Sequence, residues 1–199
     1  CVIIGGGAMG VGLLYHLAHE GWTDTLLIEK GELTSGSTWH AAGLVPNFIG
    51  SLNMAKVHAY GIELYKTLEA ETGMSTGWHG CGAIRLAVTQ DQADWYRYVQ
   101  GILGALGIES HLISPDEGRQ RVPLMGATDD IILGFWTPDD GWSDPTSSTN
   151  AMAVGARQLG AEIARHTLVT AVDQLPDGRW KVTTDKGEVT CDHVVNAAG

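Results

Sequence analysis

A glycine-rich turn between an apolar strand and a helix is the feature of this sequence that most constrains its fold. The apolar run VII (2–4) leads into GGGAMG (5–10), and a helical stretch then continues to about His19. Gly21 ends that helix, and TLLIE (25–29) is the next apolar strand. Two buried strands joined by one short helix are typical of a parallel sheet, so we expect an α/β fold.

The glycines of this turn form a dinucleotide-binding fingerprint. Gly5, Gly7 and Gly10 give GxGxxG directly after a strand and at the start of a helix, as the motif requires. The three glycines respectively permit a tight turn, an approach of the backbone to a pyrophosphate and close packing of helix on strand. Glu29 ends the second strand, where a carboxylate accepts hydrogen bonds from ribose hydroxyls and disfavours the 2′-phosphate of NADP. The fingerprint does not decide between FAD and NAD, and a glycine-rich turn without a nucleotide remains the alternative.

The loop GSTWHAAGL (36–44) is the second informative segment. Its first residues offer backbone N–H and hydroxyl groups to phosphate and ribitol oxygens: Gly36, Ser37 and Thr38. Its later small residues leave room for a flat ring system: Ala41, Ala42 and Gly43. Trp39 and His40 are the large side chains between them, and the imidazole is nucleophilic. The loop therefore favours a flavin over a nicotinamide.

With these motifs the sequence resembles the dimethylglycine/sarcosine dehydrogenase branch of the FAD-dependent D-amino-acid-oxidase-like (DAO) family, along essentially its whole length. The motifs that carry the resemblance are VIIGGGAMG, LLIEK, LTSGSTWHAAGL, KVHAYGIELYKTLEAETG, GAIRLA, PDDGWSDP, ARQLGAEI and VVNAAG. The resemblance implies a Rossmann-type FAD-binding domain with an inserted, incomplete α+β substrate domain. It also implies FAD-dependent oxidation of a secondary or tertiary N-methyl amine such as dimethylglycine or sarcosine, with hydride passing to flavin N5.

The resemblance assigns roles to further residues. In the family the histidine of STWHAAG carries the flavin through its 8α-methyl group, a role that falls on His40; a non-covalent pocket or core histidine is the alternative. Further cofactor contacts are implied at the pyrophosphate turn, the adenosine, the flavin and the last strand end: Ala8, Met9, Lys30, Leu44, Val169 and Gly199. Val169 would hold adenine through its backbone.

Two residues are candidates for the substrate. Trp142 stands in DGWSDP, where close relatives tend to carry histidine, so the accepted amine can differ from theirs. Arg85 has the donors to bind a carboxylate bidentately, although a strand arginine facing solvent is the alternative. Asp139 and Asp140 precede Gly141 and predict a turn rather than a pair of catalytic acids.

Composition excludes several other classes. Twelve basic and 23 acidic residues give a net charge of −11, which argues against a nucleic-acid or anionic-membrane partner. The three cysteines form no CxxC pair and the histidines show no metal-ligand spacing, so we expect no disulfide framework and no metal site. Residues 1–18 lack charged side chains, but their glycines favour a buried strand and helix over a membrane span.

Hydrophobic periodicity and stop signals predict the remaining elements: a helix over 52–72, a strand over 82–88, a helix ending at Gly107, a capped helix from Pro115, a strand over 131–136, a helix from Asp144-Pro145 to about Leu159, and a β-meander ending in EVTCDHVVNA (188–197). We expect an FAD-binding domain in residues 1–75, part of the inserted substrate domain in 76–143, and a return to the FAD-binding domain in 144–199.

The sequence begins inside an expected strand and stops in mid-element, so we expect it to be part of a longer protein, from the bacterial cytoplasm or the mitochondrial matrix. Any tetrahydrofolate step would belong to a domain outside it. The electron acceptor, an electron-transfer flavoprotein or oxygen, stays open. The alternatives are a non-catalytic subunit of the pyruvate dehydrogenase phosphatase regulatory type, and another DAO-family oxidase acting on glycerol 3-phosphate or D-amino acids.

Overall fold

The computed structural model describes residues 1–126 and 129–199, which form two compact units. Unit 1 comprises Cys1–Gly43, Thr67–Gly77 and Asp144–Gly199, and unit 2 comprises Leu44–Lys66 and Trp78–Ser143. Residues 44–66 therefore group with unit 2 and not with the first predicted segment, because Ala55 is buried in the core of unit 2.

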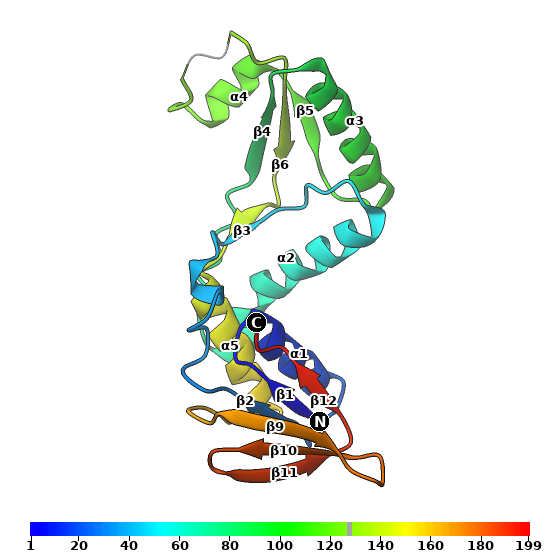
Figure 1. Cartoon of the computed structure of the whole chain (residues 1–199). Coiled ribbons are helices and arrows are strands. Elements are labelled where there is room, and N and C mark those ends of the chain that lie inside the picture. The colour runs from blue at the N-terminus through cyan, green and yellow to red at the C-terminus, as the bar shows by residue number, and fades with distance from the viewer. Residues whose placement is uncertain (127–128) are drawn as a thin grey trace. The chain divides into compact units, whose positions relative to one another are not determined.

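Unit 1 is built on a parallel sheet with the strand order β12-β1-β2-β8, of which β12, β1 and β2 are labelled in Figure 1. Its strands are β1 (Val2–Ile4), β2 (Leu26–Ile28), β8 (Glu162–Ala164) and β12 (Val194–Asn196). Helix α1 (Ala8–His19) connects β1 to β2, which confirms the predicted α/β start. β8 was not expected from the sequence, because its residues EIA do not form an apolar run like those of β1 and β2.

Helix α5 (Pro145–Gln158) packs against α1 in the same unit. As its sequence predicts, Asp144 caps it: the side chain accepts the Ser147 N–H at 2.7 Å. The two helices approach closely because Gly155 has no side chain; a Cβ there would lie 2.8 Å from the Tyr15 ring. The Tyr15 hydroxyl donates to the Glu71 carboxylate at 2.8 Å, which ties α1 to the end of helix α2 (Leu52–Thr72).

An antiparallel meander completes unit 1, made of β9 (Val169–Gln174), β10 (Trp180–Thr184) and β11 (Gly187–Cys191). Val182 forms a buried cluster with Val2 and Ile28 of the parallel sheet. The segment EVTCDHVVNA (188–197) contains two strands, separated by Asp192 and His193. Its first part belongs to β11, which pairs with β10, and its second part is β12, which pairs with β1.

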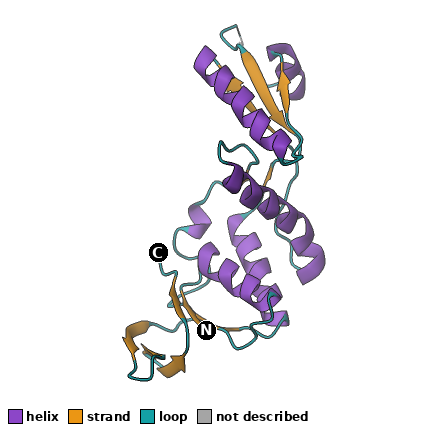
Figure 2. Ribbon diagram, turned by 90° about the vertical axis from the view of Figure 1, so that its right-hand side faces the viewer, coloured by secondary structure: helices purple, strands orange, loops and turns teal. Residues whose placement is uncertain are grey.

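Unit 2 holds an antiparallel sheet in the order β4-β6-β5, and helix α3 lies against it (Figure 2). Its elements are β4 (Ala83–Ala87), α3 (Gln90–Ala105), β5 (His111–Ile113), α4 (Pro115–Arg121) and β6 (Leu133–Thr137). The predicted capping box of α4 is present: Ser114 accepts the Glu117 N–H, and the Glu117 side chain accepts the Ser114 N–H. A two-stranded ribbon of β3 (Leu44–Val45) and β7 (Gly141–Trp142) also belongs to this unit.

No helix in the described part of the chain is both long and apolar enough to cross a membrane.

Candidate functional site

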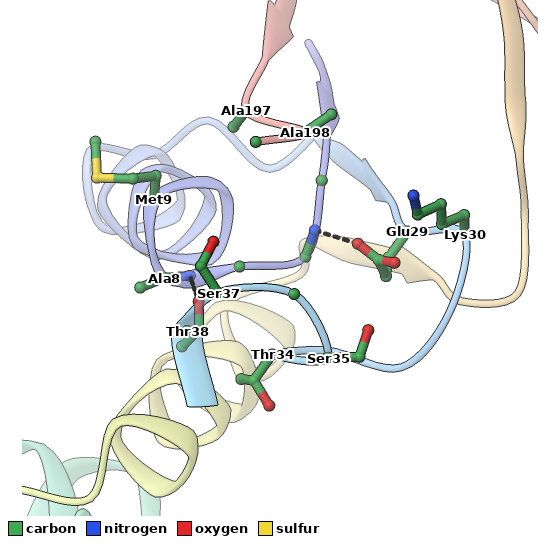
Figure 3. A pocket seen from close by; sticks show the side chains of 15 residues that line it. Ala8, Met9, Glu29, Lys30, Thr34, Ser35, Ser37, Thr38, Ala197 and Ala198 are labelled. Atoms are coloured by element: carbon green, nitrogen blue, oxygen red, sulfur yellow. Dashed lines mark hydrogen bonds between the residues drawn. The ribbon is translucent and has the colours of Figure 1, made fainter. Parts of the chain in front are cut away.

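A cleft of about 510 Å³ opens in unit 1 where the carboxyl ends of β1, β2 and β12 meet (Figure 3). Four segments line it: the turn 5–9, Glu29 with Lys30, the loop 34–38, and the strand end 197–199. Ligands of open parallel α/β sheets bind at this edge, outside the carboxyl ends of the strands. The fold thus brings the predicted fingerprint, the acid and the start of the small-residue loop into one site.

Two glycines of the fingerprint have the structural roles that the sequence predicts. Gly5 has a φ of +113°, which side-chain-bearing residues rarely adopt, and a Cβ there would overlap the carbonyl of Ala197. A Cβ on Gly10 would overlap the carbonyl oxygen of Gly5, so α1 can lie this close to β1 only without a side chain at position 10.

The Glu29 carboxylate is held by two backbone groups. The Gly6 N–H donates to Oε2, the dashed line at Glu29 in Figure 3, and the Gly31 N–H donates to Oε1, both at 2.7 Å. Each oxygen keeps a further lone pair for a ligand. Gly6 was missed at the sequence level because it lies between the motif glycines. A Cβ on Gly6 would lie 2.6 Å from Cδ2 of Leu33 and 2.9 Å from Cγ of Glu29.

The N-terminus of α1 lies at the cleft and is electropositive. Its N-cap is Gly7, which has no capping side chain, and the first turn contains no acidic residue. Unpaired N–H groups and the helix dipole favour a negatively charged ligand there. The Ala8 N–H donates to Oγ1 of Thr38 at 3.0 Å, so the Thr38 hydroxyl keeps its own proton to donate to a ligand oxygen.

A second cleft of about 190 Å³ continues past Glu29 and Lys30, which line both. Its far side is formed by Thr167, Leu168 and Val169, at the start of β9. The three residues expected at the adenosine, Glu29, Lys30 and Val169, therefore share one cavity. Thr167 and Leu168 were not predicted, since nothing in their sequence marks a backbone-lined pocket.

The loop 36–44 divides at Thr38, the last of its residues that line the first cleft. Thr38–His40 form the short 3-10 helix η1, in which Trp39 and His40 are exposed. Their rings pack on each other with centroids 3.8 Å apart. Leu44, the last residue of the predicted loop, begins β3 in unit 2.

The two substrate candidates belong to unit 2. Arg85 is half-buried on β4, with its guanidinium carbon 4.4 Å from the centroid of the Phe48 ring. Trp142 is 43% exposed on β7 and stacks on His79, with ring centroids 4.2 Å apart. Within residues 1–126 and 129–199, no three His, Cys, Asp or Glu side chains are grouped to hold a metal ion.

Known proteins resemble the chain over its whole length. The family model for FAD dependent oxidoreductases (DAO) matches residues 1–199. Mitochondrial dimethylglycine dehydrogenase of Rattus norvegicus is 44% identical over 198 residues, covering 100% of this chain and 23% of the rat protein. The mitochondrial pyruvate dehydrogenase phosphatase regulatory subunit of Mus musculus is 36% identical, again over 100% of this chain and 22% of its own length.

The crystal structure of L-proline dehydrogenase from P. horikoshii superposes with a TM-score of 0.90 at 30% identity. The match covers 98% of this chain and 51% of that one. The chain thus spans about a quarter of the two sequence relatives and about half of this structural relative.

Proposed function

Because the chain belongs to the DAO family of FAD-dependent oxidoreductases, we propose that unit 1 binds FAD and that the complete protein oxidises a secondary or tertiary N-methyl amine. Dimethylglycine and sarcosine are the proposed substrates. The observation that carries the cofactor assignment is Glu29, which is fixed by two backbone N–H groups and lines both clefts.

The residues of the two clefts fit the parts of FAD. The glycine turn and the N-terminus of α1 offer N–H groups to a pyrophosphate, with the Thr38 hydroxyl beside them. Glu29 accepts from ribose hydroxyls, and the cavity at Val169 takes the adenine. When bound, FAD supplies the acceptor of the electron pair in C–N oxidation, while the protein binds, orients and shields it.

His40 is the proposed point of covalent attachment to the flavin. It lies two residues after Thr38, in a helical turn whose two aromatic side chains are exposed. An exposed imidazole is free to react, in contrast to one that is buried and hydrogen-bonded in a core. Trp39, stacked on His40, restricts the orientation of that ring.

An anaerobic substrate screen tests the amine-oxidising activity. The complete protein, purified with its flavin, is mixed in the absence of oxygen with dimethylglycine, sarcosine, a D-amino acid or glycerol 3-phosphate. We expect the N-methyl amines to bleach the visible absorbance of the flavin. Bleaching by glycerol 3-phosphate or the D-amino acid alone would contradict the proposed substrate class.

A second candidate function is that of a non-catalytic regulatory subunit, favoured by the 36% identity to the mouse phosphatase subunit. In the screen it would show no bleaching with any compound.

Oxygen and an electron-transfer flavoprotein, added separately to the reduced enzyme, then identify the electron acceptor. The bacterial cytoplasm or the mitochondrial matrix is the proposed location.

Replacing Glu29 with alanine should weaken FAD binding, because the ribose loses its acceptor. The test uses the His40→Ala background, where the cofactor can dissociate. We expect the dissociation constant of FAD to rise about tenfold or more, as for one lost charged hydrogen bond. The matched control is Glu32→Ala, which removes an exposed carboxylate paired with Arg165 and His166. Equal FAD affinity in the Glu29 and Glu32 variants would contradict the ribose role.

A further inference from the structure

Asp140 is an unusual residue in unit 2, because its carboxyl group is buried. It is 1% exposed, in the turn between β6 and β7. Among the described residues it is the one Asp, Glu, Lys, Arg or His side chain in the buried class. Its neighbour Asp139 is exposed and pairs with Lys66, so the two acids of the predicted turn have opposite environments.

The Asp140 carboxyl group joins two segments that are far apart in the sequence. Oδ1 accepts the backbone N–H of Asn47 at 2.7 Å, and Oδ2 accepts the hydroxyl of Thr137. Its backbone carbonyl accepts the N–H of Gly82 at 2.7 Å. One residue thus fastens the segment after β3, the end of β6 and the segment before β4.

Burial and hydrogen bonding act in opposite directions on the pKa of the Asp140 carboxyl. Burial raises the pKa of the Asp140 carboxyl, against the opposing effects of its hydrogen bonds and of the Arg85 charge. The Asn47 side chain lies beside this carboxyl and lowers its pKa, while Asn47 Oδ1 is a buried acceptor without a hydrogen-bond partner in the described structure.

The segments that Asp140 fastens also hold Trp142. On one side Trp142 pairs with Leu44 in the β3–β7 ribbon. On the other side it exchanges two backbone hydrogen bonds with His79, at 2.8 and 3.1 Å. Asp140 is bonded to Asn47, three residues after Leu44, and to Gly82, three residues after His79. The backbone position of Trp142 therefore depends on both anchors.

We propose that Asp140 is a positioning residue, which through its buried hydrogen bonds fixes the β3–β7 ribbon and so sets the placement of Trp142 for recognition of the amine. The inference rests on the proposed function, since it takes Trp142 as a substrate-facing residue. Asp140 itself does not contact the substrate in this proposal. Its effect is on binding, through Trp142, and not on the chemical step.

The test compares Asp140→Ala, Asp140→Asn and the control Asp139→Ala in the complete protein. Hydrogen exchange of the Trp142 amide is measured beside KM and kcat for dimethylglycine and the flavin content. Asp140→Ala removes the acceptors of the Asn47 N–H and the Thr137 hydroxyl, so we expect Trp142 exchange and KM each to rise about tenfold or more, with kcat and flavin content retained. Asp140→Asn keeps an acceptor for Asn47 and adds donors, so it should restore wild-type values, as should Asp139→Ala.

Several outcomes would overturn the proposal. Unchanged Trp142 exchange in Asp140→Ala would show that the carboxyl does not hold the Trp142 backbone, and unchanged KM would show that its hold on Trp142 does not serve recognition. If Asp140→Asn, which keeps an acceptor for the Asn47 N–H, is as damaging as Asp140→Ala, that hydrogen bond does not place Trp142. If Asp140→Ala does not fold, Thr137→Val is used in its place, because it removes only the hydroxyl that donates to Asp140 Oδ2. A wild-type flavin that no amine reduces defeats the proposed function, while the exchange measurement still decides whether Asp140 holds Trp142.

Discussion

Replacing Gly10 with alanine is expected to destabilise unit 1 by about 3 kcal/mol or more, the upper end of the range for overpacking. The added methyl group would overlap the carbonyl oxygen of Gly5, and backbone atoms cannot move aside as the end of a side chain can. Helix α1 must then shift away from β1, which displaces its N-terminus from the cleft. We therefore expect loss of bound flavin together with the fall in stability.

Gly12→Ala is the matched control, since it adds the same methyl group to the same helix. A Cβ on Gly12 would meet no atom within 4 Å, and alanine is favoured over glycine in a helix by about 1 kcal/mol. This variant should unfold at the wild-type temperature or above it and keep its flavin. The unfolding temperature and the flavin content are measured for both variants and compared with those of the wild type. A Gly10→Ala protein as stable as Gly12→Ala would contradict the close approach of helix and strand.

Replacing His40 with alanine has the second large effect. The protein should fold, because the exposed His40 side chain contributes little to the core. Its FAD should be bound through the two clefts alone and be released on denaturation. A histidyl bond tends to raise the reduction potential of the flavin, so its loss should lower that potential. A fall of roughly 30 mV in a two-electron couple lowers the equilibrium constant for flavin reduction by a factor of about ten. We therefore expect kcat to fall by about that factor.

The control for this variant is His111→Ala, which removes another exposed imidazole, one that contacts Glu109 in unit 2. Its flavin content, flavin attachment and turnover should equal those of the wild type. Flavin that stays bonded to the denatured His40→Ala chain would show that another residue carries it.

Much of the fold could be predicted because local signals agree with tertiary packing. Helix α2 occupies the predicted residues 52–72, and Gly73 follows with a φ of +74°. The capping box at Ser114 and the Asp144-Pro145 start of α5 are likewise as expected. Capping and glycine stops are short-range interactions, so a single sequence contains them in full.

What the sequence could not show depends on pairing between distant segments. β3 and β7 have two residues each and exist because they pair with each other. Gly6 matters through a partner 23 residues away, and the bond that Thr38 accepts from the Ala8 N–H spans 30 residues. In the sequence, Asp140 resembles an ordinary turn residue. Its buried carboxyl group instead accepts a hydrogen bond from Asn47, 93 residues earlier. Such roles need the arrangement of the chain in three dimensions.

The most direct measurement is made on the complete wild-type protein. It is precipitated with acid, washed and digested, and the peptides are examined for flavin fluorescence. We predict that flavin stays with the peptide that contains His40, in equal molar amount. Flavin released intact would leave an FAD protein but contradict the attachment, and a protein that never contains flavin would contradict the proposed role of the cleft.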